Sequence, residues 1–289
     1  MAESLKIVPM VLRQKSQVAK AGGKKFVLPK VKPIYFPNVL IIGYYRKILD
    51  VINLMTSLVN EKLIPQLPNI LKQRSDSIDA RVDGYVDETS RIISGIQILF
   101  AQKYNRPSLS KVVEGEAKDI EQRQRKDLEK SLFSILGIQM PFSDPGLSDS
   151  ISNFTIQNVE LISSIPSRYF QQVEQIILRE IQAGTVGQIE KKIVGLINLE
   201  GKKAKNRAKL IARDQSSKFY NDLNRTRQKN VGIDKYRWET AGDERVRPTH
   251  RANDGKIFSW DSPPATGHPG YEINCRCVGV PALEGIVED

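Results

Sequence analysis

Apolar residues recur at steps of three and four along most of the first 230 positions of this chain. The run that begins at Asn38 shows the pattern most clearly. Its apolar positions are Leu40, Ile41, Tyr44, Ile48, Val51, Ile52, Met55 and Leu58. Such spacing places the apolar side chains on one face of a helix. The pattern predicts a predominantly helical protein whose helices pack through these faces.

Proline and glycine divide the helical region. Pro65 and Pro166 are expected to end two helices, because proline lacks the backbone N–H that a helix interior needs. Separate helices are then expected over 167–184, 185–201 and 202–232. Small polar residues and glycines at their boundaries are the expected caps: Ser75 or Asp76, Ser167, Gly184, Thr185 and Gly232.

The pattern changes after Gly232. Short stretches of alternating or apolar residues, 234–241, 257–260 and 274–280, predict strands separated by turn-rich loops. The expected fold class is α+β, predominantly α. The expected ranges are a partly extended basic arm over 1–37, a helical region over 38–159, a small α+β module over 160–283 and a tail over 284–289.

The first 37 residues are strongly basic, with eight Lys and Arg against a single acid, Glu3. Their prolines favour extended chain, while apolar residues such as Phe26 and Tyr35 favour a docking role. A solvated tail is the alternative interpretation.

The formal net charge of +11 favours a polyanionic partner, and double-stranded DNA bound without sequence specificity is the leading candidate. The candidate contacts are Lys202, Lys203, Lys205 and Lys209, together with Lys24 and Lys25 of the arm. A solvated helix face is the alternative. Apolar runs are too short to predict a membrane span.

Rare residues gather near the C-terminus. The only two histidines and two cysteines of the chain are His250, His268, Cys275 and Cys277. In a strand the two cysteines would share one face, where a disulfide between them would be strained. Three roles stay open: a structural cluster, which we favour, a zinc site made by all four residues, and a thiol catalytic site. No cofactor is expected unless zinc is bound.

A polar stripe runs along the helix that precedes the predicted strands. It comprises Arg213, Ser217, Asn221 and Asn224, again at helical steps. Short polar groups in a row differ from the usual Lys and Glu of a solvated face. They predict hydrogen bonds to a neighbouring loop.

Five pieces of sequence stand in a characteristic order in the C-terminal half. They are an Ala-Arg-Asp helix with "NRTR", then "YRW", "GDERVRPTH", "DGKIF" and finally "GHPGYEINCRC". This pattern closely resembles the phage Mu F-like minor head proteins, a family of phage head morphogenesis proteins. The resemblance covers roughly residues 160–280 and is looser in the N-terminal half.

The resemblance implies a structural virion component that lies inside the head at the portal vertex and passes through the host cytoplasm during assembly. The implied partners are the portal protein, the major capsid or scaffolding protein, and packaged DNA. No enzymatic activity is expected. A DNA-processing or toxin-like enzyme and a zinc-stabilised DNA-binding module are the alternatives.

Within such a module we expect a polar network in which Arg213, Asp214 and Asn221 meet the "GDERVRP" loop. The other expected members are Ser217, Asn224, Asp243, Arg245 and Asp254. Some family members carry cysteines where this chain has Arg247 and His250. A four-thiol cluster is therefore excluded here, and a mixed His and Cys site stays open.

Overall fold

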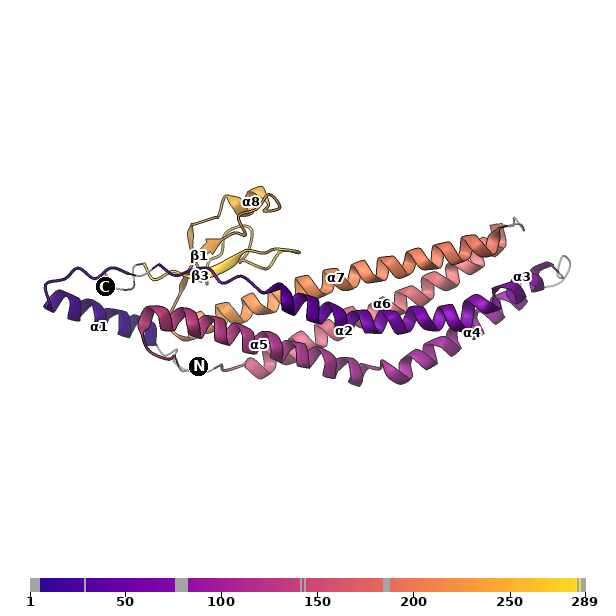
Figure 1. Ribbon diagram of the computed structural model, residues 1–289, viewed down its shortest axis with the longest axis horizontal. Helices are drawn as coiled ribbons and strands as arrows, with labels where there is room; N and C mark the ends of the chain where they lie inside the picture. Colours follow the sequence, from indigo (N-terminus) through magenta and orange to yellow (C-terminus); the bar gives the residue numbers. More distant parts are fainter. Residues whose placement is uncertain are drawn as a thin grey trace. The chain divides into compact units, whose positions relative to one another are not determined.

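The computed structural model describes residues 6–28, 30–75, 83–140, 142, 144–183, 188–284 and 286. The chain is 70% helical and has one small antiparallel sheet near the C-terminus (Figure 1). The predicted fold class, α+β and predominantly α, is confirmed.

Helices account for nearly all of the described chain before residue 231. In order they are α1 (Ile7–Ala21), α2 (Asn38–Leu58), a π-helical turn (Val59–Leu63), a 3-10 turn (Ile64–Gln66), α3 (Leu67–Ser75), α4 (Asp83–Lys103), α5 (Arg106–Leu136), α6 (Leu147–Ala183) and α7 (Ile189–Asn230). A short helix, α8 (Pro248–Arg251), lies among the strands.

Two expected helix ends at proline were wrong. The chain passes Pro65 in the first turn of a 3-10 segment, where a missing N–H costs little, and continues into α3. Pro166 lies inside α6, so Ser167 is not an N-cap. Ile165 and Tyr169 on either side of Pro166 are buried in the core. Their packing stabilises the helix where proline cannot donate a backbone hydrogen bond.

A third expected helix end, near residue 201, was also wrong. Helix α7 runs unbroken for 42 residues through Gly201, which packs closely against Thr56 of α2. It stops just before Gly232 as predicted, where Gly232 has a φ of 83°. Ser75 is the last residue of α3 and not a cap, while Asp76, Gly184 and Thr185 lie outside the described residues.

The chain forms two compact units that interleave along the sequence. The module unit contains 1–40, 116–154 and 213–289, and the helical unit contains 41–115 and 155–212. The units therefore do not follow the expected ranges 38–159 and 160–283, which stay predictions of functional domains. Most of the tail over 284–289 lies outside the described residues.

The helical unit is held by apolar faces of the kind that the sequence predicted. Ile48, Ile52 and Met55 of α2 are fully or almost fully buried, as are Ile96 of α4 and Ile193 of α7. One buried polar contact joins α2 to α6, where the hydroxyl of Tyr44 donates to Asn158 Oδ1 at 3.0 Å. No helix within the described residues has the length and apolar character to cross a membrane.

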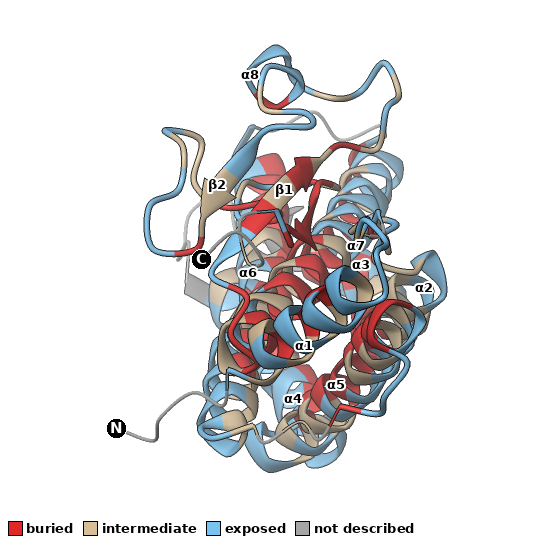
Figure 2. Cartoon of the chain, turned by 90° about the vertical axis from the view of Figure 1, so that its left-hand side faces the viewer, coloured by how far each residue is buried: buried red, intermediate tan, exposed pale blue. Residues whose placement is uncertain are grey.

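The module unit contains the sheet. Its strands are β1 (Lys235–Glu239), β2 (Ile257–Ser259) and β3 (Val278–Pro281), with β1 in the middle and antiparallel to both neighbours. Figure 2 shows that β1 is partly buried, whereas β2 is exposed or half-buried. Strands were predicted in all three places, but the last begins after the cysteines.

The basic arm was predicted to be partly extended, and its first half contains a helix that was not predicted. Residues 7–21 form helix α1, in which Pro9 occupies the first turn and removes no intrahelical hydrogen bond. Val8 and Leu12 of α1 are fully buried in one apolar cluster with Ile233 and Val280. The arm therefore belongs to the module unit and packs against the rest of it.

The segment after α1 is irregular and follows the same unit. Arg237 of β1 donates to the carbonyl of Val31 at 3.0 Å, and the hydroxyl of Tyr35 donates to the carbonyl of Thr240 at 2.8 Å. The ring of Phe36 contacts the ring of Tyr220, with centroids 5.1 Å apart. These contacts bind the arm along most of its described length.

Candidate functional site

Three of the four rare residues converge on one point of the module unit. His250 comes from α8, and Cys275 and Cys277 come from the segment before β3. The Nδ1 atom of His250 lies 3.5 Å from the sulfur of Cys275 and 3.5 Å from the sulfur of Cys277. All three residues are at least 96% buried. The cysteines were expected in a strand, but they lie in the irregular segment just before β3.

The two thiols differ in their hydrogen bonds and in the direction of their pKa shifts. The Cys275 sulfur accepts backbone N–H groups from Gly270 at 3.4 Å and from Cys277 at 3.5 Å. A hydrogen bond from the Cys277 thiol lowers the pKa of Cys275 to about 6, and the two N–H donors act in the same direction. Cys277 has its pKa raised, first by its hydrogen bond to Cys275 and then by burial. Cys275 is therefore the more acidic of the two thiols.

The far side of the His250 ring faces a carboxylate. Nε2 lies 3.1 Å from Oε2 of Glu272 without forming a hydrogen bond to it, and it has no hydrogen-bond partner among the described residues. Glu272 is also 3.3 Å from the guanidinium of Arg247. The edge of Trp238 packs against the imidazole at 5.3 Å between centroids. Sequence reasoning missed Glu272, because nothing in its spacing marks it as a partner of His250.

The fourth rare residue, His268, has different partners. Its Nδ1 lies 3.2 Å from the hydroxyl of Tyr236, and its ring packs among Tyr236, Trp260 and Tyr271. Burial lowers its pKa below the usual value, which favours the neutral ring. Among the described residues it is not part of the His250 cluster, so the predicted four-residue set was wrong in this member.

The polar stripe of α7 meets the segment that carries the cysteines. Ser217 donates to the carbonyl of Cys275 at 3.2 Å, and Asn224 donates to the carbonyl of Gly279 at 2.9 Å. Asn221 lies so close to Gly270 that an added Cβ would be 2.4 Å from its Nδ2 atom. Ser217 and Asn224 therefore make the expected hydrogen bonds to a neighbouring segment, which is 270–279 and not the "GDERVRP" loop.

The other expected members of the network are dispersed through the unit. Asp214 accepts from Lys218 of its own helix at 2.8 Å, and Arg213 is half-buried without a hydrogen bond to the described residues. The backbone N–H of Thr240 donates to Asp254 at 2.7 Å. Arg213 and Asp214 therefore do not form the expected contact with the loop.

Asp243 is the one carboxylate of the "GDERVRP" loop that closes on the cysteine segment. It accepts two hydrogen bonds from Arg276 at 2.7 and 2.5 Å, one from the guanidinium of Arg245 at 3.1 Å and one from the backbone N–H of Arg245 at 3.2 Å. The bonds from Arg276 lower the pKa of Asp243. This bidentate pair joins the loop to the residue between the two cysteines.

A buried ion network was missed by sequence reasoning. Arg227 of α7 is 1% exposed and forms ion pairs with Glu121 of α5 and with Asp144 of the loop before α6. It also donates to Gln124 at 2.5 Å. The "NRTR" motif contains this arginine, but nothing in the sequence says which of its two arginines is buried.

Comparison with known proteins bears on the C-terminal part of the chain. Residues 171–280 match a family model described as "Phage Mu protein F like protein". This segment is phage Mu F-like. The match includes the polar stripe, Arg227, the sheet and the His250 cluster, and it confirms the resemblance that the motifs indicated.

A curated relative matches about half of the chain. An uncharacterized protein of Haemophilus influenzae is 41% identical over 143 residues, which are 49% of this chain and 31% of the relative. The chain thus spans about a third of the length of that relative. No solved structure matches.

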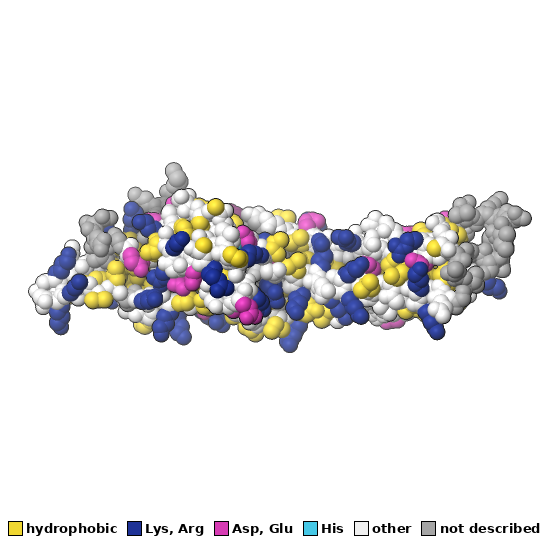
Figure 3. Space-filling model, turned by 90° about the horizontal axis from the view of Figure 1, so that it is seen from above, with side chains coloured by type: hydrophobic (Ala, Val, Ile, Leu, Met, Phe, Trp, Pro, Cys, Tyr) yellow, Lys and Arg dark blue, Asp and Glu magenta, His cyan; other side chains and the backbone are white. Residues whose placement is uncertain are grey.

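The lysines expected to contact DNA are exposed. Lys202, Lys203, Lys205 and Lys209 lie on α7 within the Mu F-like segment, and Lys203 pairs with Glu200 at 2.6 Å. Lys24 and Lys25 follow α1, outside the Mu F-like segment. On the face shown in Figure 3, Lys and Arg side chains are more widespread than Asp and Glu.

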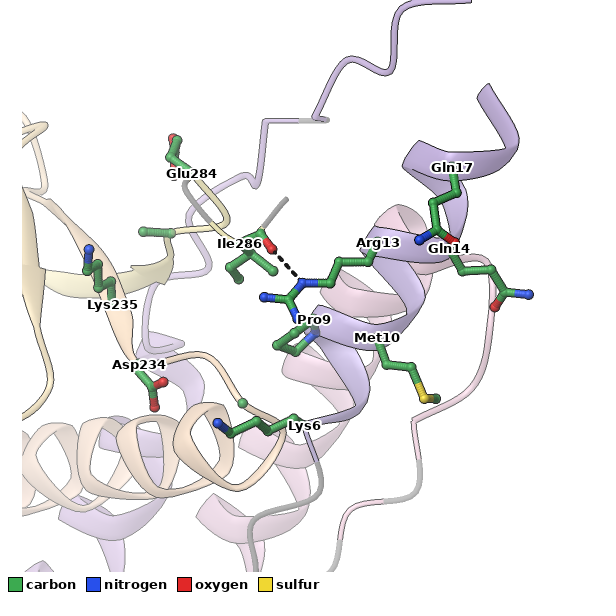
Figure 4. Close-up of a pocket in the computed structure, with 12 residues that line it drawn as sticks. Lys6, Pro9, Met10, Arg13, Gln14, Gln17, Asp234, Lys235, Glu284 and Ile286 are labelled. Carbon is green, nitrogen blue, oxygen red and sulfur yellow. Dashed lines mark hydrogen bonds between the residues drawn. The ribbon is translucent and has the colours of Figure 1, made fainter. Parts of the chain in front are cut away.

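A pocket of about 680 Å³ lies between α1 and residues that flank the sheet. Figure 4 shows Arg13 of α1 and Lys6, which precedes the helix, on one side and Asp234, Lys235 and Glu284 on the other. Arg13 donates to the carbonyl of Ile286 at 3.3 Å. None of its 12 lining residues is His, Cys or Ser. The pocket therefore offers no serine or cysteine nucleophile and no histidine base.

Proposed function

We propose that this chain is a structural minor head protein of a tailed bacteriophage and acts in head morphogenesis at the portal vertex. The single observation that carries the proposal is the Mu F-like match over 171–280, since that family suggests a phage head morphogenesis protein. Localisation in the virion follows from the same proposal.

A structural role agrees with how the rare residues are used. His250, Cys275 and Cys277 are buried, and His268 is packed among aromatic rings. A nucleophile and its base need access to a substrate, and burial on this scale opposes it. We therefore propose that the protein is not an enzyme.

The helical unit is the part we assign to docking on the portal. The arm packs against other parts of the module unit. It is therefore a weaker candidate for docking on the portal than expected. The helical unit leaves Ile98, Leu99 and Ile156 at least 41% exposed on α4 and α6. Apolar residues exposed on helices fit a protein partner such as the portal.

The composition of purified heads tests the main proposal. We expect the chain to co-purify with the portal protein at a constant ratio across all gradient fractions that contain heads, measured by quantitative mass spectrometry. Host cytosolic proteins serve as the control, because contaminants vary between fractions. A ratio that varies as the contaminants do would contradict the proposal.

Contact with packaged DNA is proposed separately, because it rests on exposed lysines and net charge. Each phosphate contact contributes about 0.9 to the slope of log K against log salt, so four lysines contribute at most about 3.6. Changing Lys202, Lys203, Lys205 and Lys209 to Gln should weaken binding and reduce this slope in gel shifts at several salt concentrations.

A matched variant controls for net charge in the DNA experiment. Lys62, Lys72, Lys126 and Lys130 are also exposed, and their replacement by Gln removes the same charge elsewhere. Equal slopes for the two variants would contradict a DNA contact by the α7 lysines. Absence of a gel shift with the unmodified protein at low salt would contradict it as well.

A further inference from the structure

We propose that His250, Cys275 and Cys277 bind a zinc ion through Nδ1 and the two sulfurs. The three ligand atoms lie within 4.8 Å of one another and come from α8 and the segment before β3. The ion would tie these two parts of the module together. This inference does not depend on the proposed role in the phage head.

The distances fit tetrahedral coordination. Zinc bonds to sulfur and nitrogen are about 2.3 and 2.0 Å long, so tetrahedral geometry places the two ligand atoms about 3.5 Å apart. Nδ1 of His250 lies 3.5 Å from the sulfur of Cys275 and 3.5 Å from that of Cys277. Both sulfur–nitrogen separations therefore match those of a zinc site.

Distance alone does not separate a metal site from hydrogen bonds between thiols and imidazole. The orientation of His250 adds an independent observation, because Nε2 faces the Glu272 carboxylate at 3.1 Å. Nε2 has no hydrogen-bond partner among the described residues. A proton on this nitrogen, beside the carboxylate, leaves the lone pair on Nδ1, which lies next to both sulfurs. Metal-binding histidines characteristically have such a carboxylate behind the ring.

The surroundings of the Cys275 sulfur also favour metal binding. Cys275 accepts two backbone N–H groups, from Gly270 and Cys277, which stabilise negative charge on sulfur. Two thiolates with one imidazole are soft donors that favour zinc over magnesium or calcium. This donor set therefore selects the chemical class of the metal.

Three protein ligands leave one position for water or another donor. His268 does not supply it, because its Nδ1 lies beside the hydroxyl of Tyr236. Glu272 does not supply it either, since it lies at the opposite nitrogen of the His250 ring. Because the ligands are at least 96% buried, we assign the ion a stabilising role in the module.

Metal content and thermal stability of the full chain test the proposal. Protein purified without chelators should contain equimolar zinc by elemental analysis. A chelator should lower the Tm, and added zinc, but not magnesium, should restore it. Purified protein without zinc whose Tm does not respond to added zinc would overturn the proposal.

Variants distinguish this ligand set from the four-residue set predicted from sequence. Cys275→Ser and Cys277→Ser should lose zinc, whereas His268→Gln, measured on folded protein, should keep it. Loss of zinc from folded His268→Gln would overturn the assignment. Because the serine variants can fail to fold, Co²⁺ is added to wild-type protein as well. A thiolate-to-cobalt charge-transfer band is expected, and its absence would contradict cysteine ligation.

Discussion

Arg227 shows how a single residue joins segments that lie far apart in the chain. Its guanidinium pairs with Glu121 and Asp144 and also donates to the carbonyl of Glu121. Charges taken out of water are tolerated only when their partners are in place. Arg227 therefore stabilises the packing of α7 on α5 and on the loop before α6.

Replacement of Arg227 by Met should be strongly destabilising. It preserves much of the side-chain volume but leaves Glu121 and Asp144 with Arg125 as their remaining partner. We expect the free energy of unfolding to fall by about 3 kcal/mol, the lower end for a broken buried pair. Urea denaturation measures it.

The control is Lys229→Met on the same helix. Lys229 pairs with Asp261 at 2.5 Å, but both side chains are at least 35% exposed. A loss below about 1 kcal/mol is expected for such a surface pair. Equal losses for the two variants would contradict a structural role for the buried network.

At the scale of elements, sequence periodicity predicted which segments are helices but not where they end. Pro166 and Gly201 weaken a helix locally, yet α6 and α7 continue through them. Buried side chains around Pro166 provide tertiary packing that outweighs this local preference. Local signals carry no information about such packing, so the joined helices were not predictable from them.

The candidate site was predicted in part for a related reason. The scarcity of His and Cys correctly directed attention to four residues, and three of them meet. His268 is excluded by its contact with Tyr236, a partner 32 positions away in sequence. Glu272 enters through the fold of the loop before Cys275. Both facts depend on three-dimensional contacts that spacing does not encode.

The docking of α1 yields a prediction at this scale. Leu12 is fully buried in the apolar cluster, whereas Met10 of the same helix is 62% exposed. Leu12→Ala should lower the free energy of unfolding by about 3 kcal/mol, since it leaves a cavity. Met10→Ala should change it by no more than about 0.5 kcal/mol. Thermal or urea denaturation distinguishes these outcomes, and equal effects would show that α1 does not dock in solution.

At the scale of the whole molecule, the two compact units are built from alternating parts of the chain. The module unit needs 1–40 and 116–154 as well as the C-terminal residues 213–289. A fragment that starts near residue 160 would therefore lack α1, all of α5 and the first part of α6. Functional experiments on this protein need the full chain.

The central claim is that the chain is a head component located at the portal vertex. A localised cryo-EM reconstruction of that vertex, from heads with and without the chain, tests it most directly. We predict helical density against the portal that fits the helical unit and disappears when the chain is absent. Identical maps of the vertex from the two kinds of head would contradict the claim.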